Sequence, residues 1–387
     1  MINMNWINKC ISSIFIILLS ISFSLVIFVL FDFTYNYFTK QDVETCEILR
    51  DKGFYELKPN CNGTGKFYSN YYPIFTDQFG FRIKSFDFKG IEKASIIFLG
   101  DSFTFGINGS WDQSFVGMFE KKTNLKVINA GLASYSPTVY VYQYKKALKA
   151  DILSKPHDVI VAIDISDVQD QAGFWERGDK HPIKMKYSLS LKGENSLLLE
   201  HEKESGDYLI LIRSQLKKAL PFTRSIYHYI KTIGSEKNVL KTNTDLPRSA
   251  FTHVEWSVLD QYHAAPDQMG YLPLGVEKGL TEVVNELREI KNIAQKNNGR
   301  VILLIYPWPA QMIYEQSIFS WNNFIISVCK KIECDGVIDT FNAFKISQSE
   351  GVNLNDIFQL GDVHFTEFGN QILVDELISS YEILRMH

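Results

Sequence analysis

The sequence is poor in the residues that mark metalloproteins and nucleic-acid-binding proteins. Among its 387 residues are only five cysteines and eight histidines. No Cys-x-x-Cys spacing or nearby pair of histidines indicates a zinc site. No strongly basic run occurs and the net charge is -4, so nothing favours a nucleic-acid partner. Internal repeats are also lacking. We therefore expect an ordinary globular chain, with no cofactor, that is long enough to bury a large core.

One region lacks charge altogether, between residues 11 and 31. It is about long enough to cross a bilayer as a helix. Lys9 precedes it and Asp32 follows it, a weak bias that places the N-terminus in the cytoplasm. A signal peptide would have a shorter apolar core and a small-x-small cleavage site, which residues 28–37 do not offer. We expect an uncleaved single-pass anchor in the cytoplasmic membrane, with residues 32–387 facing the periplasm or the cell exterior.

The few cysteines agree with export. Cys10 lies at the mouth of the apolar span, and the other four are Cys46, Cys61, Cys329 and Cys334. An even number of cysteines in an exported domain suggests disulfides, and four cysteines allow three pairings. Of these we favour the local one, Cys46–Cys61 with Cys329–Cys334.

The rest of the chain alternates short apolar runs with helical patterns. This predicts an α/β fold of three layers, α/β/α, around a parallel, flavodoxin-like sheet of five strands. The expected strands are 96–99, 125–129, 158–164, 301–306 and 336–339.

Three further boundaries follow from the same pattern. Residues 93–387 form the expected main domain, and the juxtamembrane segment 32–92 packs around its edge. Residues 171–270 interrupt the strand–helix rhythm and are too long for a simple connection. We expect this insertion to form a cap over the active-site edge, with a hairpin at 187–201 and a helix at 208–233.

Two segments near opposite ends of the chain carry candidate chemistry. The strand at 96–99 runs into a Gly-Asp-Ser turn that places Ser102 at the C-terminal edge of the sheet, where α/β proteins bind ligands. Near the C-terminus, Asp362 and His364 are two residues apart and project to the same side of extended backbone. The carboxylate can then orient the ring, and the ring can take a proton from a hydroxyl. The pattern predicts a hydrolytic triad; a metal site formed by Asp101, Asp362 and His364 is a less favoured alternative.

The sequence GDSFTFG at 100–106, together with the late Asp-Val-His at 362–364, resembles the first and last blocks of the SGNH/GDSL hydrolase family. The resemblance covers about residues 94–170 and 300–385. It implies an ester hydrolase in which Ser102 is the nucleophile, His364 the base and Asp362 the residue that orients it.

Two intermediate blocks depart from the family pattern. Where the family has a glycine whose backbone N–H binds the oxyanion, this chain has Ser134. Where the family has an asparagine whose side-chain amide also binds it, this chain has Ser166. A backbone donor survives the first change if the backbone shape permits, whereas an amide donor does not survive the second.

Two further residues are candidates for substrate contact. Asp167 follows the third expected strand at the same edge, and Trp308 lies in a Pro-Trp-Pro turn where it either lines a sugar site or packs the loop. An anchored domain rich in aromatic residues fits an acylated carbohydrate of the cell envelope. We expect an acyl esterase; an O-acyltransferase with the same triad and a glycan-binding module with a decayed site remain alternatives.

Overall fold

The computed structural model describes residues 45–67, 70–85, 93–185, 248–253, 271–314 and 316–386, with isolated positions between 16 and 34. Within these residues no helix has both the length and the apolar character needed to span a bilayer. The expected anchor at 11–31 falls largely outside them, and the hairpin and helix expected at 187–233 do so entirely; these remain predictions. The chain divides into two compact units, and the larger one comprises residues 43–194 and 238–387.

A sheet of eight strands forms the centre of this unit, in the order β12-β11-β8-β6-β7-β5-β4-β3. Its first five strands pair in parallel. They are β6 (Ala94–Leu99), β7 (Val127–Asn129), β8 (Leu153–Ala162), β11 (Gly299–Ile305) and β12 (Gly336–Asp339). Numbered along the chain, these strands are arranged 2-1-3-4-5, the flavodoxin-like order, which is the order expected. Ligands bind such sheets beyond the ends of strands 1 and 3, here β6 and β8.

The predicted count of five strands is wrong for the sheet as a whole, because residues 62–83 add three more. β3 (Asn62–Phe67), β4 (Asn70–Thr76) and β5 (Arg82–Ile83) are antiparallel, and β5 joins the sheet through the pair Arg82–Asn129. In β4 the alternate side chains Tyr72 and Ile74 are buried, whereas Tyr71 and Pro73 beside them are exposed. This two-residue period is typical of a half-buried strand. A segment assigned to edge packing is thus part of the sheet.

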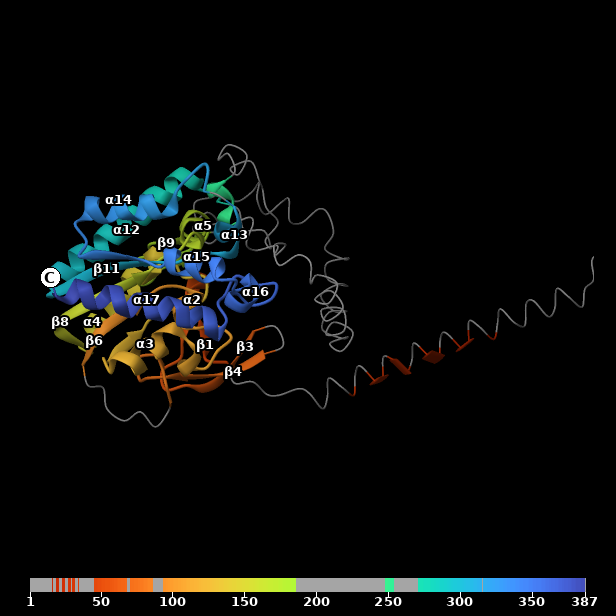
Figure 1. The fold of residues 1–387 in the computed structure, drawn as a ribbon. Helices are drawn as coiled ribbons and strands as arrows, with labels where there is room; N and C mark the ends of the chain where they lie inside the picture. Colours follow the sequence, from red (N-terminus) through yellow and green to blue (C-terminus); the bar gives the residue numbers. More distant parts are fainter. Residues whose placement is uncertain are drawn as a thin grey trace, which may run out of the picture. The chain divides into compact units, whose positions relative to one another are not determined.

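Helices cover both faces of the parallel strands. On one face α3 (Phe115–Thr123) lies beside α17 (Glu367–Met386), and on the other α12 (Val276–Lys296) contacts α4 (Pro137–Lys149), α5 (Ser166–Gly173) and α14 (Trp321–Ile332) (Figure 1). The remaining helices are α2 (Ser102–Phe105), α13 (Pro309–Ile313), α15 (Phe341–Ser349) and α16 (Leu354–Ile357), with the 3-10 turns η1 (Asp51–Gly53), η2 (Trp111–Gln113) and η3 (Ala250–Thr252). The three-layer α/β/α expectation is met.

Among the described residues there are also two small antiparallel strand pairs. β1 (Glu47–Leu49) pairs with β2 (Tyr55–Leu57), and β9 (Trp175–Glu176) pairs with β10 (Ile183–Lys184). The second pair lies at the start of the predicted insertion.

Both favoured disulfides are present. Cys46–Cys61 joins the residue before β1 to the residue before β3, with a Cα–Cα distance of 5.7 Å. Cys329–Cys334 joins the last turn of α14 to the segment before β12, with a Cα–Cα distance of 4.9 Å. The local pairing is confirmed.

Candidate active site

Ser102, His364 and Asp362 form a hydrogen-bonded chain. The hydroxyl oxygen of Ser102 lies 2.7 Å from His364 Nε2, and His364 Nδ1 bonds a carboxylate oxygen of Asp362. That carboxylate oxygen also accepts the backbone N–H of His364 at 2.9 Å. Both ring nitrogens of His364 are therefore engaged. Among the described residues, no three histidine, cysteine or acidic side chains, Asp101, Asp362 and His364 included, are grouped so that they could hold a metal ion.

The two ends of this chain of contacts are held by short, well-fixed turns. Ser102 is the first residue of α2, directly after the buried strand β6, and the side chain of Asp101 caps the helix by accepting the N–H of Phe103 at 2.9 Å. Asp362 and His364 lie in a loop closed at its base by a bridge between Phe358 and Phe365. The end of β6 and this closed loop thus bring Ser102 and His364, which are 262 residues apart in the sequence, into contact.

Aromatic rings surround the imidazole of His364. Phe103 of α2 packs against it with ring centroids 4.8 Å apart, and Phe67, at the end of β3, meets it edge-on at 5.3 Å. The His364 side chain is only 13% exposed. These contacts restrict the ring to the orientation in which Nε2 faces Ser102.

The loop that contains Ser134 is pressed against α2. Gly131 leaves no room for a side chain, because a Cβ there would lie 2.6 Å from the backbone nitrogen of Phe105 and 2.9 Å from the carbonyl oxygen of Asp101. Ser134 has φ +54°, the left-handed region that non-glycine residues seldom adopt. Ser134 thus takes a backbone shape that glycine adopts more readily than serine does. Among the described residues, neither the N–H of Ser134 nor that of Ser102 has a hydrogen-bond acceptor.

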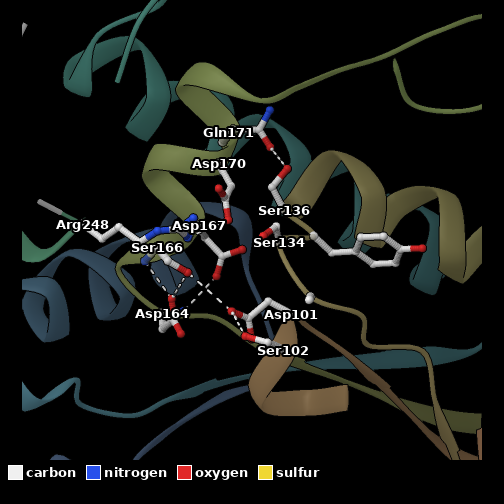
Figure 2. A network of polar contacts seen from close by, with 12 residues as sticks. Asp101, Ser102, Ser134, Ser136, Asp164, Ser166, Asp167, Asp170, Gln171 and Arg248 are labelled. Carbon is white, nitrogen blue, oxygen red and sulfur yellow. Dashed lines mark hydrogen bonds and ion pairs between the residues drawn. The ribbon is translucent and has the colours of Figure 1, made fainter. Parts of the chain in front are cut away.

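The side chain of Ser166 does not point its hydroxyl proton toward the proposed oxyanion site beside Ser102 and Ser134. Its hydroxyl donates to Asp164 at 2.7 Å and lies 3.5 Å from Asp101 (Figure 2). The residue is 1% exposed at the start of α5. A hydroxyl has a single proton to donate, so Ser166 does not supply the donor that an asparagine amide would.

Asp167 and Trp308, the two further candidates for substrate contact, are both buried and engaged in internal hydrogen bonds. The carboxylate of Asp167 accepts from the Tyr140 hydroxyl at 2.6 Å and from the N–H of Asp164 at 2.9 Å, and it is 1% exposed. The indole of Trp308 is buried and donates to Asp164 at 2.9 Å. Both residues fix the turn after β8 instead, because neither presents a free polar atom at the surface. The packing alternative for Trp308 is the one the structure shows.

Behind Ser102 lies a group of buried carboxyl groups, drawn in Figure 2. Burial, reinforced by the neighbouring Asp164, raises the pKa values of Asp101 and Asp167 well above the usual range. Burial also raises the pKa of Asp170 to about 6, although Arg248 lies 3.0 Å away and opposes the shift. Arg248 comes from the predicted insertion, so that part of the chain supplies a positive charge to the floor of the site.

Comparisons with known proteins were made for the whole chain. No protein-family model matches it, and no curated protein does. Among solved structures it is similar to a lipolytic protein of the G-D-S-L family from Veillonella parvula, with 12% identity, a TM-score of 0.36, and coverage of 73% of this chain and 96% of that one. It is also similar to TesA, with 10% identity, a TM-score of 0.38, and coverage of 75% of this chain and 98% of that one. A third similar structure is a catalytic mutant of Axe2, an acetylxylan esterase from Geobacillus stearothermophilus. It has 13% identity and a TM-score of 0.37, and the match covers 74% of this chain and 93% of that one. At these TM-scores and identities, the likenesses assign no activity to this chain.

Sequence reasoning missed the residues that hold the Ser134 loop. Tyr55 donates its hydroxyl to the carbonyl of Ala133 at 2.5 Å, and Trp175 donates its indole N–H to the carbonyl of Ser134 at 2.6 Å. Tyr55 lies in a segment assigned to the edge and Trp175 in the predicted insertion. Neither position carries a motif that could have been recognised.

Proposed function

We propose that this protein is a serine-dependent acyl-ester hydrolase of the SGNH/GDSL kind. The observation that carries the proposal is the chain of contacts from Asp362 through His364 to Ser102, with 2.7 Å between imidazole and hydroxyl. A hydroxyl held this close to an oriented imidazole is the arrangement that nucleophilic acyl transfer requires. Ser102, just after β6, therefore has a base within hydrogen-bonding distance.

The mechanism follows from these positions. The oxygen of Ser102 attacks the ester carbonyl carbon while His364 Nε2 takes the hydroxyl proton. The carbonyl oxygen becomes negative, and the N–H groups of Ser102 and Ser134 are the donors that stabilise it. The alcohol then leaves with the proton from His364, giving an acyl-serine. Water attacks that ester, again losing its proton to His364, and releases the acid and free Ser102.

Asp362 acts on the ring rather than on the substrate. Its carboxylate holds the proton on Nδ1, so that Nε2 is the basic nitrogen, and it stabilises the imidazolium while the proton is in transit. Phe103 and Phe67 pack against the ring and keep it from turning away.

We further propose that the substrate is an O-acylated glycan of the cell envelope or of the exterior, and that residues 11–31 anchor the enzyme in the cytoplasmic membrane. The two disulfides support an oxidising compartment outside the cytoplasm. A reporter enzyme that is active only outside the cytoplasm, fused after residues 1–44, should therefore be active. Recovery of a mature protein that begins downstream of residue 31 would contradict the anchor.

The catalytic proposal is tested by labelling and by turnover. A fluorophosphonate probe should modify the wild-type protein at Ser102, and p-nitrophenyl acetate should release p-nitrophenol. Repeating the turnover with an oligosaccharide present separates hydrolysis from transfer, because an acyltransferase would yield an acylated oligosaccharide. A folded protein that the probe does not label would contradict the proposal and favour a glycan-binding module.

A further inference from the structure

Ser134 stands where a donor for the oxyanion is needed, but its own backbone preference opposes that role. A residue with a Cβ rarely holds φ near +54°, because the side chain crowds the backbone. A left-handed serine persists only where its surroundings hold it in place. The surroundings of Ser134 therefore decide which way its N–H points.

Two side chains grip the peptide groups on either side of Ser134. The Tyr55 hydroxyl donates to the carbonyl of Ala133 at 2.5 Å, and the Trp175 indole N–H donates to the carbonyl of Ser134 at 2.6 Å. The carbonyl of Ala133 and the N–H of Ser134 belong to the same planar trans peptide group, so they point in opposite directions. Fixing that carbonyl on Tyr55 consequently fixes the Ser134 N–H on the opposite side.

Tyr55 and Trp175 are themselves well held. Trp175 is fully buried, and the rings of Tyr55 and Trp175 pack with centroids 5.5 Å apart. Tyr135 contacts both rings, tilted against Tyr55 at 5.8 Å and edge-on to Trp175 at 6.4 Å, and its hydroxyl donates to the carbonyl of Tyr55 at 2.8 Å. Burial raises the pKa of Tyr55 far above its ordinary value, so its hydroxyl keeps its proton throughout the working pH range. The opposite side of the loop is held by Gln171, which accepts from the Ser136 hydroxyl at 3.0 Å (Figure 2).

We propose that Tyr55 and Trp175 are positioning residues that lock the Ser134 peptide in its left-handed form and so direct its N–H at the ester oxygen when Ser102 attacks. The inference rests on the proposed function. It explains how a serine replaces the glycine of the resembling family. It also assigns a role to two segments outside the parallel core, β2 and β9.

The test compares Tyr55→Phe with Tyr135→Phe. Each variant removes one buried tyrosine hydroxyl that donates to a backbone carbonyl in the same aromatic cluster, but only the first releases the Ala133–Ser134 peptide. In Tyr55→Phe we expect kcat to fall by about tenfold or more, short of the ~10²–10³ that follows complete loss of one donor. KM should be unchanged. The rate of fluorophosphonate labelling at Ser102 should fall with kcat, because the phosphoryl oxygen occupies the position of the ester oxygen.

Equal kcat losses in the two tyrosine variants, or a loss expressed only in KM, would overturn the inference. If Tyr55→Phe does not fold, the same comparison of kcat, KM and labelling rate is made between Trp175→Phe and its control, Trp111→Phe. Trp111 is also buried, and its substitution removes an equivalent indole hydrogen bond, the one to Glu120 of α3 at 3.1 Å. An unlabelled, inactive wild type would instead refute the proposed function, and the inference would fall with it.

Discussion

The guanidinium of Arg82 donates a 2.8 Å hydrogen bond to the carbonyl of Gly106, at the end of the short helix that Ser102 begins. A second bond from the same guanidinium reaches the carbonyl of Gly109 at 2.7 Å, and its plane stacks on the ring of Phe105. Burial lowers the pKa of Arg82 to about 10, yet it stays charged at neutral pH. The antiparallel strand β5 thus holds the segment that follows Ser102, the proposed nucleophile.

We predict that Arg82→Met lowers the free energy of unfolding by about 3 kcal/mol, because charged hydrogen bonds are lost and buried carbonyls are left without donors. Urea unfolding measures the change. Lys84→Met is the matched control, since Lys84 is half exposed and its ion pair with Asp112 contributes roughly 0–1 kcal/mol. Equal effects of the two substitutions would contradict a clamping role.

The losses of activity caused by substitutions in the proposed triad should not be additive. Ser102→Ala and His364→Ala should each abolish most ester hydrolysis, and the double variant should be scarcely worse, because the members act as one unit. Asp362→Asn should be milder, since Phe103 and Phe67 still hold the ring. The measurement is kcat/KM with p-nitrophenyl acetate. Losses that multiply in the double variant would contradict a shared step.

Ser166 should prove dispensable as an oxyanion donor. Its proton is already given to Asp164, so we expect Ser166→Ala to lower kcat by less than about tenfold, whereas loss of a true donor costs ~10²–10³. Ser166→Asn should not raise activity, because two extra heavy atoms enter a fully buried site at a cost of about 1–3 kcal/mol. A gain of activity in the asparagine variant would show that the hole lacks a side-chain donor.

Stability should depend on pH through Asp170. Burial raises its carboxyl pKa from the ordinary 3.8 to about 6 in the folded protein, so the folded state binds the proton more tightly than the unfolded state does. This contribution is present in full below about pH 4 and is lost as pH rises through 6, a change of up to about 3 kcal/mol. Asp101 and Asp167, with pKa values raised in the same direction, add to the trend.

The measurement is urea unfolding of the wild type and of Asp170→Asn between pH 4 and pH 7. The advantage of the wild type over the variant should shrink as pH rises. An advantage that grows with pH would mean that the ion pair with Arg248 outweighs the burial of the carboxyl.

The two disulfides should contribute unequally. In the chain-entropy model, removing Cys46–Cys61, with a separation of 15 residues, costs about 3 kcal/mol, and removing Cys329–Cys334, with a separation of 5, costs about 2 kcal/mol. Double alanine variants compared by urea unfolding test the order. Thiol labelling of the denatured, unreduced protein should find Cys10 alone, and four further reactive thiols would contradict both bridges.

The sequence predicts the framework of the site well, for simple reasons. Buried parallel strands read as continuous apolar runs, so β6 and β8 are visible, and whatever follows them lies at one edge of the sheet. Asp362 and His364 stand two residues apart in a turn, and that spacing alone makes their contact with each other foreseeable. Their meeting with Ser102 follows from the strand order, whereas their catalytic role remains a prediction.

The finer parts of the site could not be predicted, because they depend on where single polar groups find partners. Nothing local shows that the Ser166 hydroxyl turns to Asp164, or that Trp308 donates to the same carboxylate. The left-handed backbone of Ser134 is fixed by side chains from β2 and β9, distant in sequence. Likewise, the strands at 62–83 are short and rich in glycine and aromatic residues, so that their period of two is weak.

The single pairing of β5 with β7 has a practical consequence for anyone who would truncate this protein. The predicted domain boundary suggests a recombinant fragment that begins at residue 93. Such a fragment would leave the backbone of β7 unpaired at the edge of the sheet, and exposed edge strands promote self-association. It would also lack Arg82, Tyr55 and the Cys46–Cys61 bridge. A fragment that keeps these contacts starts before Cys46, so the stretch next to the proposed anchor belongs to the folded domain and is more than a tether.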